Sequence, residues 1–175
     1  GAGADALVVD VGGGSTEIAC RELGLRQSIP IGAVVLTETW IESARDLAAG
    51  WKGLRAAVRE VVAAFPSGVA IGRAAWAIGG TAVNLGNLHA GRTLFDPRAV
   101  EGLAVPAARA LEFGELLGPL THAERLAFPV EPDRADILPA GLVVLGTVLE
   151  HLGARTVSVS GFGLRHGLAR ELLDG

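Results

Sequence analysis

Several residue types are scarce or absent in this sequence of 175 residues, and each absence excludes a class of protein. The single cysteine, Cys20, excludes an internal disulfide and any CxxC metal or redox site. The longest apolar helical run, 141–149, is about half of the ~20 residues that a membrane span needs. With 15 basic against 19 acidic residues there is no basic stripe, so nucleic acid is not an expected partner. No signal peptide is visible, and we expect a cytoplasmic protein.

Methionine is also absent, and the chain begins at Gly1. We therefore expect an excerpt or a processed chain, with part of its chemistry supplied by residues outside it. An apolar fraction of 50% allows a substantial buried core. At this length the chain is expected to form one domain, or one half of a two-lobed protein.

The hydrophobic pattern predicts strands and helices in a particular order. Three strands come first, then helices, a strand, more helices, a strand and a last helix. An antiparallel start followed by strand–helix alternation implies an α/β fold, a mixed sheet with helices packed on its faces. The expected strands are 6–11, 15–21, 27–31, 74–78 and 156–160, and the expected helices are 36–49, 54–65, 81–89, 105–117, 123–128, 135–152 and one ending at Leu173.

The strongest chemical signal is the segment Asp10–Glu17, with the sequence DVGGGSTE. Three glycines let backbone N–H groups approach an anion, and Ser15 and Thr16 add hydroxyl donors. Asp10 is placed to hold a hydrated Mg²⁺, and Glu17 to orient water or metal. The same spacing also fits a plain glycine-turn hairpin in which Asp10 caps the turn and Glu17 is solvated.

Familiar phosphate and nucleophile motifs are not matched here. No lysine follows the glycines as a P-loop needs, and Glu17 stands where the dinucleotide fingerprint and the nucleophile elbow each need glycine. Ser15 is therefore interpreted as a hydrogen-bond donor and not as a nucleophile. The four histidines form no metal-binding pattern, and the three tryptophans are expected to pack in the core or against a partner.

Two further glycine turns and one arginine are secondary candidates. Gly79-Gly80-Thr81 opens a helix whose N-terminus could bind phosphate, although plain capping by Thr81 is the simpler interpretation. Arg134 is a candidate phosphate ligand, or a structural ion pair with Asp133 and Asp136, of which Asp133 also suits an N-cap. The third turn, 161–165, ends at Arg165, which touches a ligand or forms a salt bridge.

Taken together, the motifs resemble the second lobe of the exopolyphosphatase / guanosine pentaphosphate phosphohydrolase family, in the actin–sugar kinase–Hsp70 superfamily. The Asp-x-Gly-Gly-Gly-Ser core is common to the superfamily, whereas the later segments make the resemblance specific. The matching segments run in the family's order and cover nearly the whole chain: 10–17, 29–38, 77–81, 134–141 and 160–165.

The resemblance implies an RNase H-like (actin-like ATPase) lobe that hydrolyses terminal phosphoanhydride bonds with Mg²⁺ or Mn²⁺. Its substrate would be inorganic polyphosphate, guanosine pentaphosphate or both, in a full-length homodimer. By this analogy Asp10 (also the metal ligand) and Glu17 are the catalytic acids. The implied phosphate-binding residues are Gly12, Gly13, Gly14, Ser15, Thr16, Gly79, Gly80, Thr81 and Arg134.

Two departures and two alternatives accompany this resemblance. The family's glutamate base belongs to a first lobe that this sequence lacks, so we expect activity only with that lobe. His166 stands where the family usually carries glutamate, and its role is undetermined. The alternatives are an ATP-dependent kinase or ATPase of the same superfamily, in which Gly79–Thr81 line an adenosine pocket, and a phosphate or alarmone sensor that binds without hydrolysis.

Overall fold

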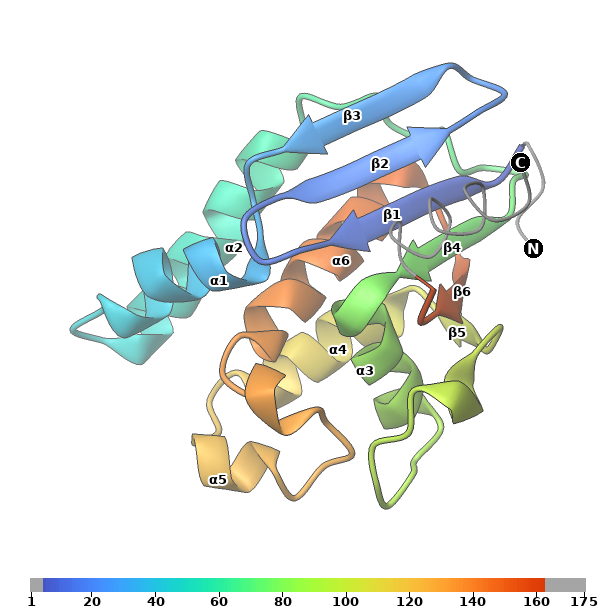
Figure 1. Cartoon of the computed structure of the whole chain (residues 1–175). Helices are drawn as coiled ribbons and strands as arrows, with labels where there is room; N and C mark the ends of the chain where they lie inside the picture. Colours follow the sequence, from blue (N-terminus) through green and yellow to red (C-terminus); the bar gives the residue numbers. More distant parts are fainter. Residues whose placement is uncertain (1–4, 163–175) are drawn as a thin grey trace.

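A mixed six-stranded sheet with helices packed against it organises the chain (Figure 1). The structure is a computed structural model and describes residues 5–162. The strands lie in the order β3-β2-β1-β4-β6-β5. The first three form an antiparallel meander, β1, β4 and β6 run parallel, and β5 is antiparallel to β6. The strands are β1 (Leu7–Val11), β2 (Thr16–Cys20), β3 (Leu25–Ile29), β4 (Ala75–Ile78), β5 (Ala104–Pro106) and β6 (Thr156–Ser160).

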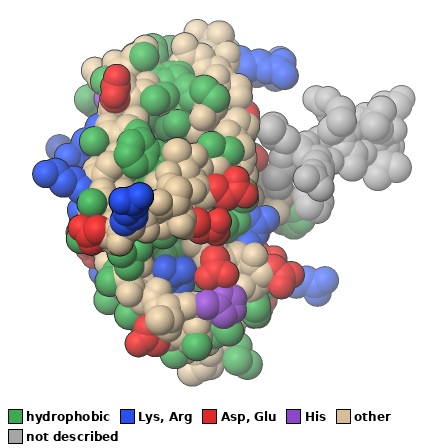
Figure 2. Space-filling model, turned by 90° about the vertical axis from the view of Figure 1, so that its left-hand side faces the viewer, with side chains coloured by type: hydrophobic (Ala, Val, Ile, Leu, Met, Phe, Trp, Pro, Cys, Tyr) green, Lys and Arg blue, Asp and Glu red, His purple; other side chains and the backbone are tan. Residues whose placement is uncertain are grey.

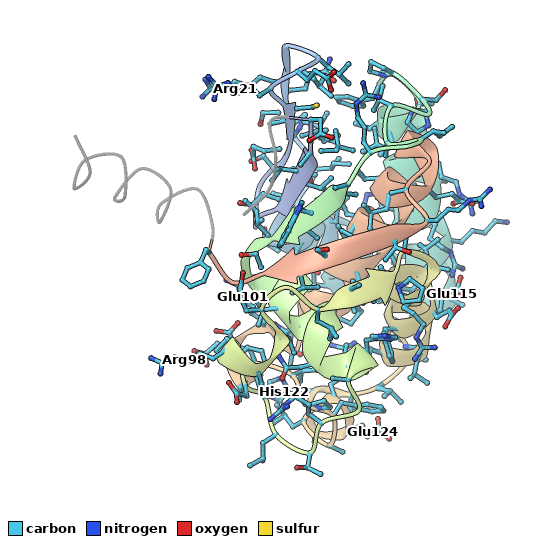
Figure 3. The ribbon with its side chains drawn as sticks, turned by 90° about the vertical axis from the view of Figure 1, so that its right-hand side faces the viewer. Arg21, Arg98, Glu101, Glu115, His122 and Glu124 are labelled. Atoms are coloured by element: carbon cyan, nitrogen blue, oxygen red, sulfur yellow. The ribbon has the colours of Figure 1, made fainter. Side chains whose placement is uncertain are left out.

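The helices alternate with the parallel strands, which confirms the predicted fold class. The expectation of helices on both faces of the sheet is not met by residues 5–162, in which the larger helices lie on one side (Figure 3). The predicted helix that ends at Leu173 lies outside the described residues. The α-helices are α1 (Ala33–Leu36), α2 (Leu47–Val62), α3 (Gly79–His89), α4 (Ala108–Leu117), α5 (His122–Arg125) and α6 (Leu138–Leu152). Short π and 3-10 helices are η1 (Thr37–Glu42), η2 (Arg98–Val100) and η3 (Pro132–Arg134).

Alternation along β1 separates the core from the face that carries the polar residues. Leu7, Val9 and Val11 are buried toward the helices, whereas Val8 and Asp10 are half-buried on the opposite face. Side chains of neighbouring strands that stand in register share a face. The register therefore places one row of side chains across the sheet on the Asp10 face, with the polar Ser28, Glu17, Asp10 and Ser160 and the apolar Ile78.

Helix α6 forms the centre of the core, as its continuously apolar sequence predicts. Its residues are buried on nearly every face, and it packs along α4. Pro139 lies in the first turn, where a proline costs no helical hydrogen bond. Gly153 ends the helix with φ of 78°, a left-handed conformation that favours glycine.

The predicted helix break at Gly50 is wrong. The chain breaks earlier, and α2 begins after Asp46, whose side chain accepts a hydrogen bond from Ala48 N. Gly50 instead lies inside α2. Glycine is needed at this position because a Cβ would come within 2.3 Å of the Trp40 carbonyl oxygen. This glycine serves the close packing of η1 against α2.

The predicted helix 105–117 is also too long, because its first residues form β5. Strand β5 pairs with β6, and the helix α4 begins only at Ala108. A three-residue strand that contains Pro106 has too short a pattern to be recognised by alternation.

The exposed surface carries charges of both signs. On the face in Figure 2, acidic side chains lie among basic and hydrophobic ones. None of the helices between residues 5 and 162 has the length and apolarity needed to cross a membrane.

Candidate functional site

Asp10 and Glu17 occupy directly opposite positions on β1 and β2. Side chains at such positions have Cβ atoms about 5 Å apart, so the two carboxylates stand side by side on the half-exposed face of the sheet. Glu17 Oε1 accepts hydrogen bonds from the Ser15 hydroxyl at 2.6 Å and from the Ser28 hydroxyl at 2.9 Å. One carboxylate oxygen of Glu17 is thus fixed, and the interpretation of Glu17 as a freely solvated side chain is wrong.

The surroundings of Asp10 disfavour the ionised form of its carboxyl group. Its pKa is raised above the ordinary value of 3.8, first because the group is partly buried and second because Glu17 lies next to it, while Arg134 lowers the pKa. The backbone of Gly79 is part of this burial, since a Cβ on Gly79 would lie 2.7 Å from Asp10 Oδ1. Gly79 also has φ of 84°, so glycine is required here twice over.

The glycine loop after β1 presents backbone donors that no described residue uses. Gly12 N donates to Ser15 O at 2.8 Å and closes the turn. The carbonyls of Gly12 and Gly13 accept from the first amides of α1. Within residues 5–162, the amides of Gly13, Gly14 and Ser15 donate no hydrogen bond. Successive free amides in a turn can bind an anion, although none of the three glycines here adopts a positive φ.

A second group of free donors lies at the N-terminus of α3. The helix begins at Gly79 directly after β4, and no side chain caps it. Since β1 and β4 are parallel neighbours, their carboxyl ends place the glycine loop and this helix N-terminus at the same edge of the sheet. The Thr81 hydroxyl donates to Val11 O at 3.1 Å and fastens the first turn of α3 to β1. The prediction that Thr81 caps the helix is therefore wrong, because Thr81 lies inside it.

Arg134 reaches the first turn of α3 from a distant part of the chain. Its guanidinium lies against Gly80, where a Cβ would be 2.4 Å from both Cζ and Nε. Arg134 Nε also pairs with Glu131 Oε2 at 2.7 Å. The predicted pairing with Asp133 and Asp136 is wrong, as is the N-cap role of Asp133: Glu131 precedes η3 and Ile137 precedes α6 at the N-cap positions.

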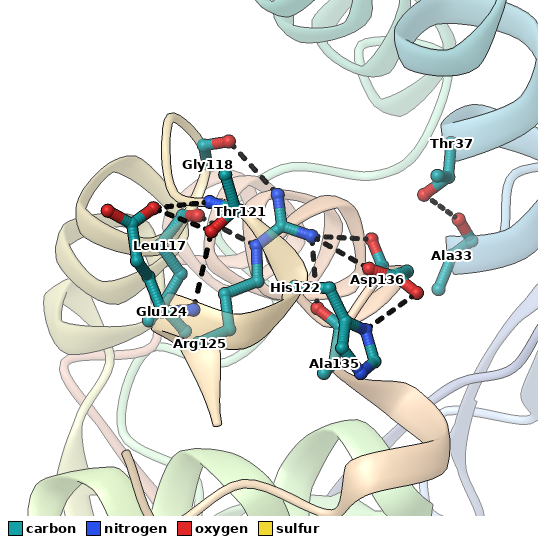
Figure 4. A network of polar contacts seen from close by, with 10 residues as sticks. All are labelled: Ala33, Thr37, Leu117, Gly118, Thr121, His122, Glu124, Arg125, Ala135 and Asp136. Atoms are coloured by element: carbon teal, nitrogen blue, oxygen red, sulfur yellow. Dashed lines mark hydrogen bonds and ion pairs between the residues drawn. The ribbon is translucent and has the colours of Figure 1, made fainter. Parts of the chain in front are cut away.

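The segment that follows Arg134 is held by a buried arginine that the sequence did not single out (Figure 4). The Arg125 guanidinium donates to the carbonyl oxygens of Leu117 and Gly118 at the end of α4 and to Ala135 O. It also contacts Asp136, which pairs with His122 in turn. Burial lowers the pKa of Arg125, and Asp136 opposes that shift. The carbonyls of a helix C-terminus are natural partners of a cation.

The hydroxyls of Thr16, a predicted donor, and of Thr81, a phosphate-binding residue by the resemblance, face the core. The Thr16 hydroxyl is fully buried and donates to Ile31 O at 2.7 Å, and the Thr81 hydroxyl is committed to Val11. The prediction of a phosphate-binding hydroxyl at Thr16 is therefore wrong, and at Thr81 only the backbone remains for such a role. The Ser15 hydroxyl is directed to Glu17. Arg165 and His166 lie outside the described residues.

Another polar residue at this edge, Asn84, also went unnoticed in the sequence. It is fully buried on α3, donates to Gly80 O at 2.9 Å and accepts from Glu131 N at 2.7 Å. The sequence signal for a buried polar contact here was the pair Asn84 and Asn87, three residues apart in a mostly apolar helix.

The acidic pair suits a hard divalent cation held jointly with phosphate. Among residues 5–162 no group of three or more histidine, cysteine or acidic side chains gathers to hold a metal. Mg²⁺, however, is commonly held by one or two carboxylates together with substrate phosphates and water. The raised pKa of Asp10 beside Glu17 is the state that a bound cation would relieve.

A large cavity of about 1020 Å³ lies at the other end of the sheet. Its lining includes Arg73 just before β4 and Thr156 at the start of β6, and so it adjoins the amino ends of the parallel strands. Ligands of open α/β sheets bind at the carboxyl ends of the strands. We therefore place the candidate site at the edge that carries Asp10, Glu17 and Arg134.

The chain is similar to proteins of one known family. A model of the "Ppx/GppA phosphatase family" matches residues 1–174. The chain is 33% identical over 182 residues to "Exopolyphosphatase 2" of Mycobacterium tuberculosis, covering 98% of this chain and 56% of that protein. It thus spans about half the length of the curated relatives it matches.

Solved structures of related proteins have a similar fold. A Ppx/GppA family member from Aquifex aeolicus is 28% identical with a TM-score of 0.78, over 97% of this chain and 56% of that one. An exopolyphosphatase-like protein is 25% identical with a TM-score of 0.82, over 96% of this chain and 59% of that one. The predicted actin-like ATPase fold is thereby confirmed.

Proposed function

Because this chain belongs to the Ppx/GppA phosphatase family, we propose that it carries one half of a site that hydrolyses terminal phosphoanhydride bonds of inorganic polyphosphate. A single arrangement supports the proposal best. The Asp10–Glu17 pair lies at the edge of the sheet where the free amides of residues 13–15, the uncapped α3 N-terminus and Arg134 also lie. Anion donors beside paired acids suit the hydrolysis of a polyanion.

Each group has a separate task in this scheme. The free amides of the glycine loop and the first amides of α3 bind phosphate oxygens, and Arg134 neutralises their charge. Glu17, fixed through one oxygen by Ser15 and Ser28, orients the attacking water with the other. Asp10 would hold Mg²⁺ or Mn²⁺, which supplies charge neutralisation at the transferred phosphoryl group when bound. No covalent nucleophile is needed, since phosphoryl transfer depends mainly on positioning and electrostatics.

We further propose that hydrolysis needs a first lobe, because the matched relatives are nearly twice as long as this chain. The name of the Mycobacterium tuberculosis relative supports polyphosphate as the substrate. Guanosine pentaphosphate has the same terminal phosphoanhydride and is the second proposed substrate.

The test is phosphate release by the full-length protein with Mg²⁺ from long-chain polyphosphate, guanosine pentaphosphate and ATP. We expect release from polyphosphate, with a loss of at least about 10²-fold in Glu17→Gln. ATP turnover alone would favour a kinase or ATPase. Binding of polyphosphate without turnover would favour a sensor.

A further inference from the structure

Asn84 connects two distant parts of the candidate site. Its side chain is fully buried, yet both of its polar atoms have backbone partners: Nδ2 donates to Gly80 O at 2.9 Å and Oδ1 accepts from Glu131 N at 2.7 Å. Only this orientation of the amide satisfies both partners, because one is a carbonyl and the other an N–H. The side chain thereby joins the first turn of α3 to the segment that carries Arg134.

The residue that Asn84 holds is the one that orients Arg134. Glu131 accepts from Arg134 Nε at 2.7 Å, and the guanidinium lies against Gly80. Asn84 thus binds the backbone of Gly80 and of Glu131, the two residues that the Arg134 side chain contacts. We propose that Asn84 is a positioning residue that keeps the Arg134 guanidinium over the N-terminus of α3, where it meets a phosphate. This inference rests on the proposed function.

Asn87, one turn further along α3, is a matched structural counterpart. It is also fully buried, donates to the carbonyl of Val83 four residues earlier at 2.9 Å, and accepts from Asp96 N at 2.8 Å. It fastens the segment after α3 and not the segment of Arg134. Loss of either asparagine leaves one backbone N–H without its partner, so the two losses should destabilise the fold similarly. If loss of Asn84 weakens substrate binding more than loss of Asn87 does, the difference reflects the role of Asn84 in the candidate site.

Serine is the sharpest replacement at both positions. In a helix its hydroxyl bonds the carbonyl four residues earlier, as Thr147 does to Val143 O at 2.8 Å in α6. Asn84→Ser therefore keeps the bond to Gly80 and is too short to reach Glu131. Asn87→Ser keeps the bond to Val83 and loses the bond to Asp96.

The experiment compares Asn84→Ser, Asn87→Ser, Arg134→Ala and the double variant Asn84→Ser/Arg134→Ala in the full-length protein. We measure kcat and KM on polyphosphate, the dissociation constant of tripolyphosphate and the melting temperature. For Asn84→Ser we expect KM and the tripolyphosphate dissociation constant to rise about tenfold, with kcat changed less than about threefold, as for a misplaced binding group. Asn87→Ser should lower the melting temperature to a similar extent and leave KM within about twofold of wild type.

The double variant tests whether Asn84 acts through Arg134. We expect its KM to equal that of Arg134→Ala, because the positioning residue has nothing left to position. Additive effects, or equal KM changes in the two serine variants, would overturn the inference.

Failure of the proposed function gives a different pattern. A wild-type protein that binds tripolyphosphate but cleaves no polyphosphate contradicts the proposed function, and the binding constants of the same variants then decide the role of Asn84. If the wild-type protein does not bind tripolyphosphate at all, the positioning role is overturned as well.

Discussion

Asp10 on β1 and Glu17 on β2 stand directly opposite each other across an antiparallel pair of strands joined by the glycine loop. Partial burial is the larger cause of the raised pKa of Asp10, and the neighbouring Glu17 carboxylate adds to the effect. Arg134 opposes it from the first turn of α3. The fold thus keeps an unfavourable pair of charges next to free anion donors. Such an arrangement is expected where function, and not stability, selects the residues.

Asp10→Asn should therefore stabilise the protein at neutral pH while it removes activity. Since the pKa of Asp10 is raised on folding, the native state binds more protons than the unfolded chain between pH 3.8 and the raised value. Stability falls as the pH rises through that window, and the whole cost is present above it. Asparagine does not ionise, so the variant should melt at a higher temperature than wild type at pH 7, with a difference that shrinks toward pH 4.

Asp133→Asn is the control for this comparison, because Asp133 is an exposed acid close to the site in sequence. Its melting temperature should follow that of the wild type at both pH values. An Asp10→Asn protein that melts below wild type at pH 7 would contradict the electrostatic description of the site.

Gly80→Ala should weaken substrate binding without destabilising the fold. The added Cβ would meet the Arg134 guanidinium, the end of a flexible side chain that can move away. Alanine is favoured over glycine inside a helix by about 1 kcal/mol, so stability should be unchanged or higher. Displacement of the arginine should raise KM for polyphosphate several-fold. Steady-state kinetics and thermal melting check both parts, and an unchanged KM would show that the position of Arg134 does not matter.

Ser28→Ala should lower kcat, because Ser28 holds the carboxylate of Glu17 from the neighbouring strand at 2.9 Å. We expect a decrease of about threefold to tenfold, since the Ser15 hydroxyl still binds the same oxygen. Ser28→Thr keeps the hydroxyl and suits a strand, so it should retain most of the activity. Equal rates in the alanine and threonine variants would contradict a role for this hydrogen bond.

Gly50→Ala should destabilise the protein, opposite to the effect of this change in an exposed helix. The Cβ would lie 2.3 Å from the Trp40 carbonyl oxygen and 2.9 Å from Ala44 Cβ, so η1 must move away from α2. Overpacking of this kind costs about 1–3 kcal/mol. Chemical denaturation measures the change, and a variant more stable than wild type would show that this contact is not tight.

Strong local patterns made most of the fold predictable. The strands around Val9 and Val159 are short and rich in β-branched residues, whereas the apolar run of α6 is too long for a strand. Gly50 was misread as a helix break because its reason is a contact with Trp40, ten positions away. Strand β5 was not recognised because it is defined by its pairing with β6 and not by its own sequence.

The site was predictable only in part, for a related reason. The DVGGGSTE segment is contiguous, so Asp10 and Glu17 could be named from spacing together with a family resemblance. The partners of Arg134 depend on tertiary contacts with Glu131 and Gly80, and the nearest acids in sequence were the wrong ones. Thr16 and Thr81 have hydroxyls of the right chemistry that the fold turns inward. Asn84 binds Glu131, which lies 47 positions further along the chain, and no local pattern reveals such a contact.

Phosphate release from long-chain polyphosphate by the full-length protein is the most direct test of the account. Wild type and Asp10→Asn are compared with Mg²⁺ and with EDTA, and the fold of each is checked by thermal melting. We predict release by wild type that EDTA abolishes, and a rate at least about 10²-fold lower in a stably folded Asp10→Asn. Near-wild-type release by Asp10→Asn would contradict the assignment of the acidic pair as the reacting centre.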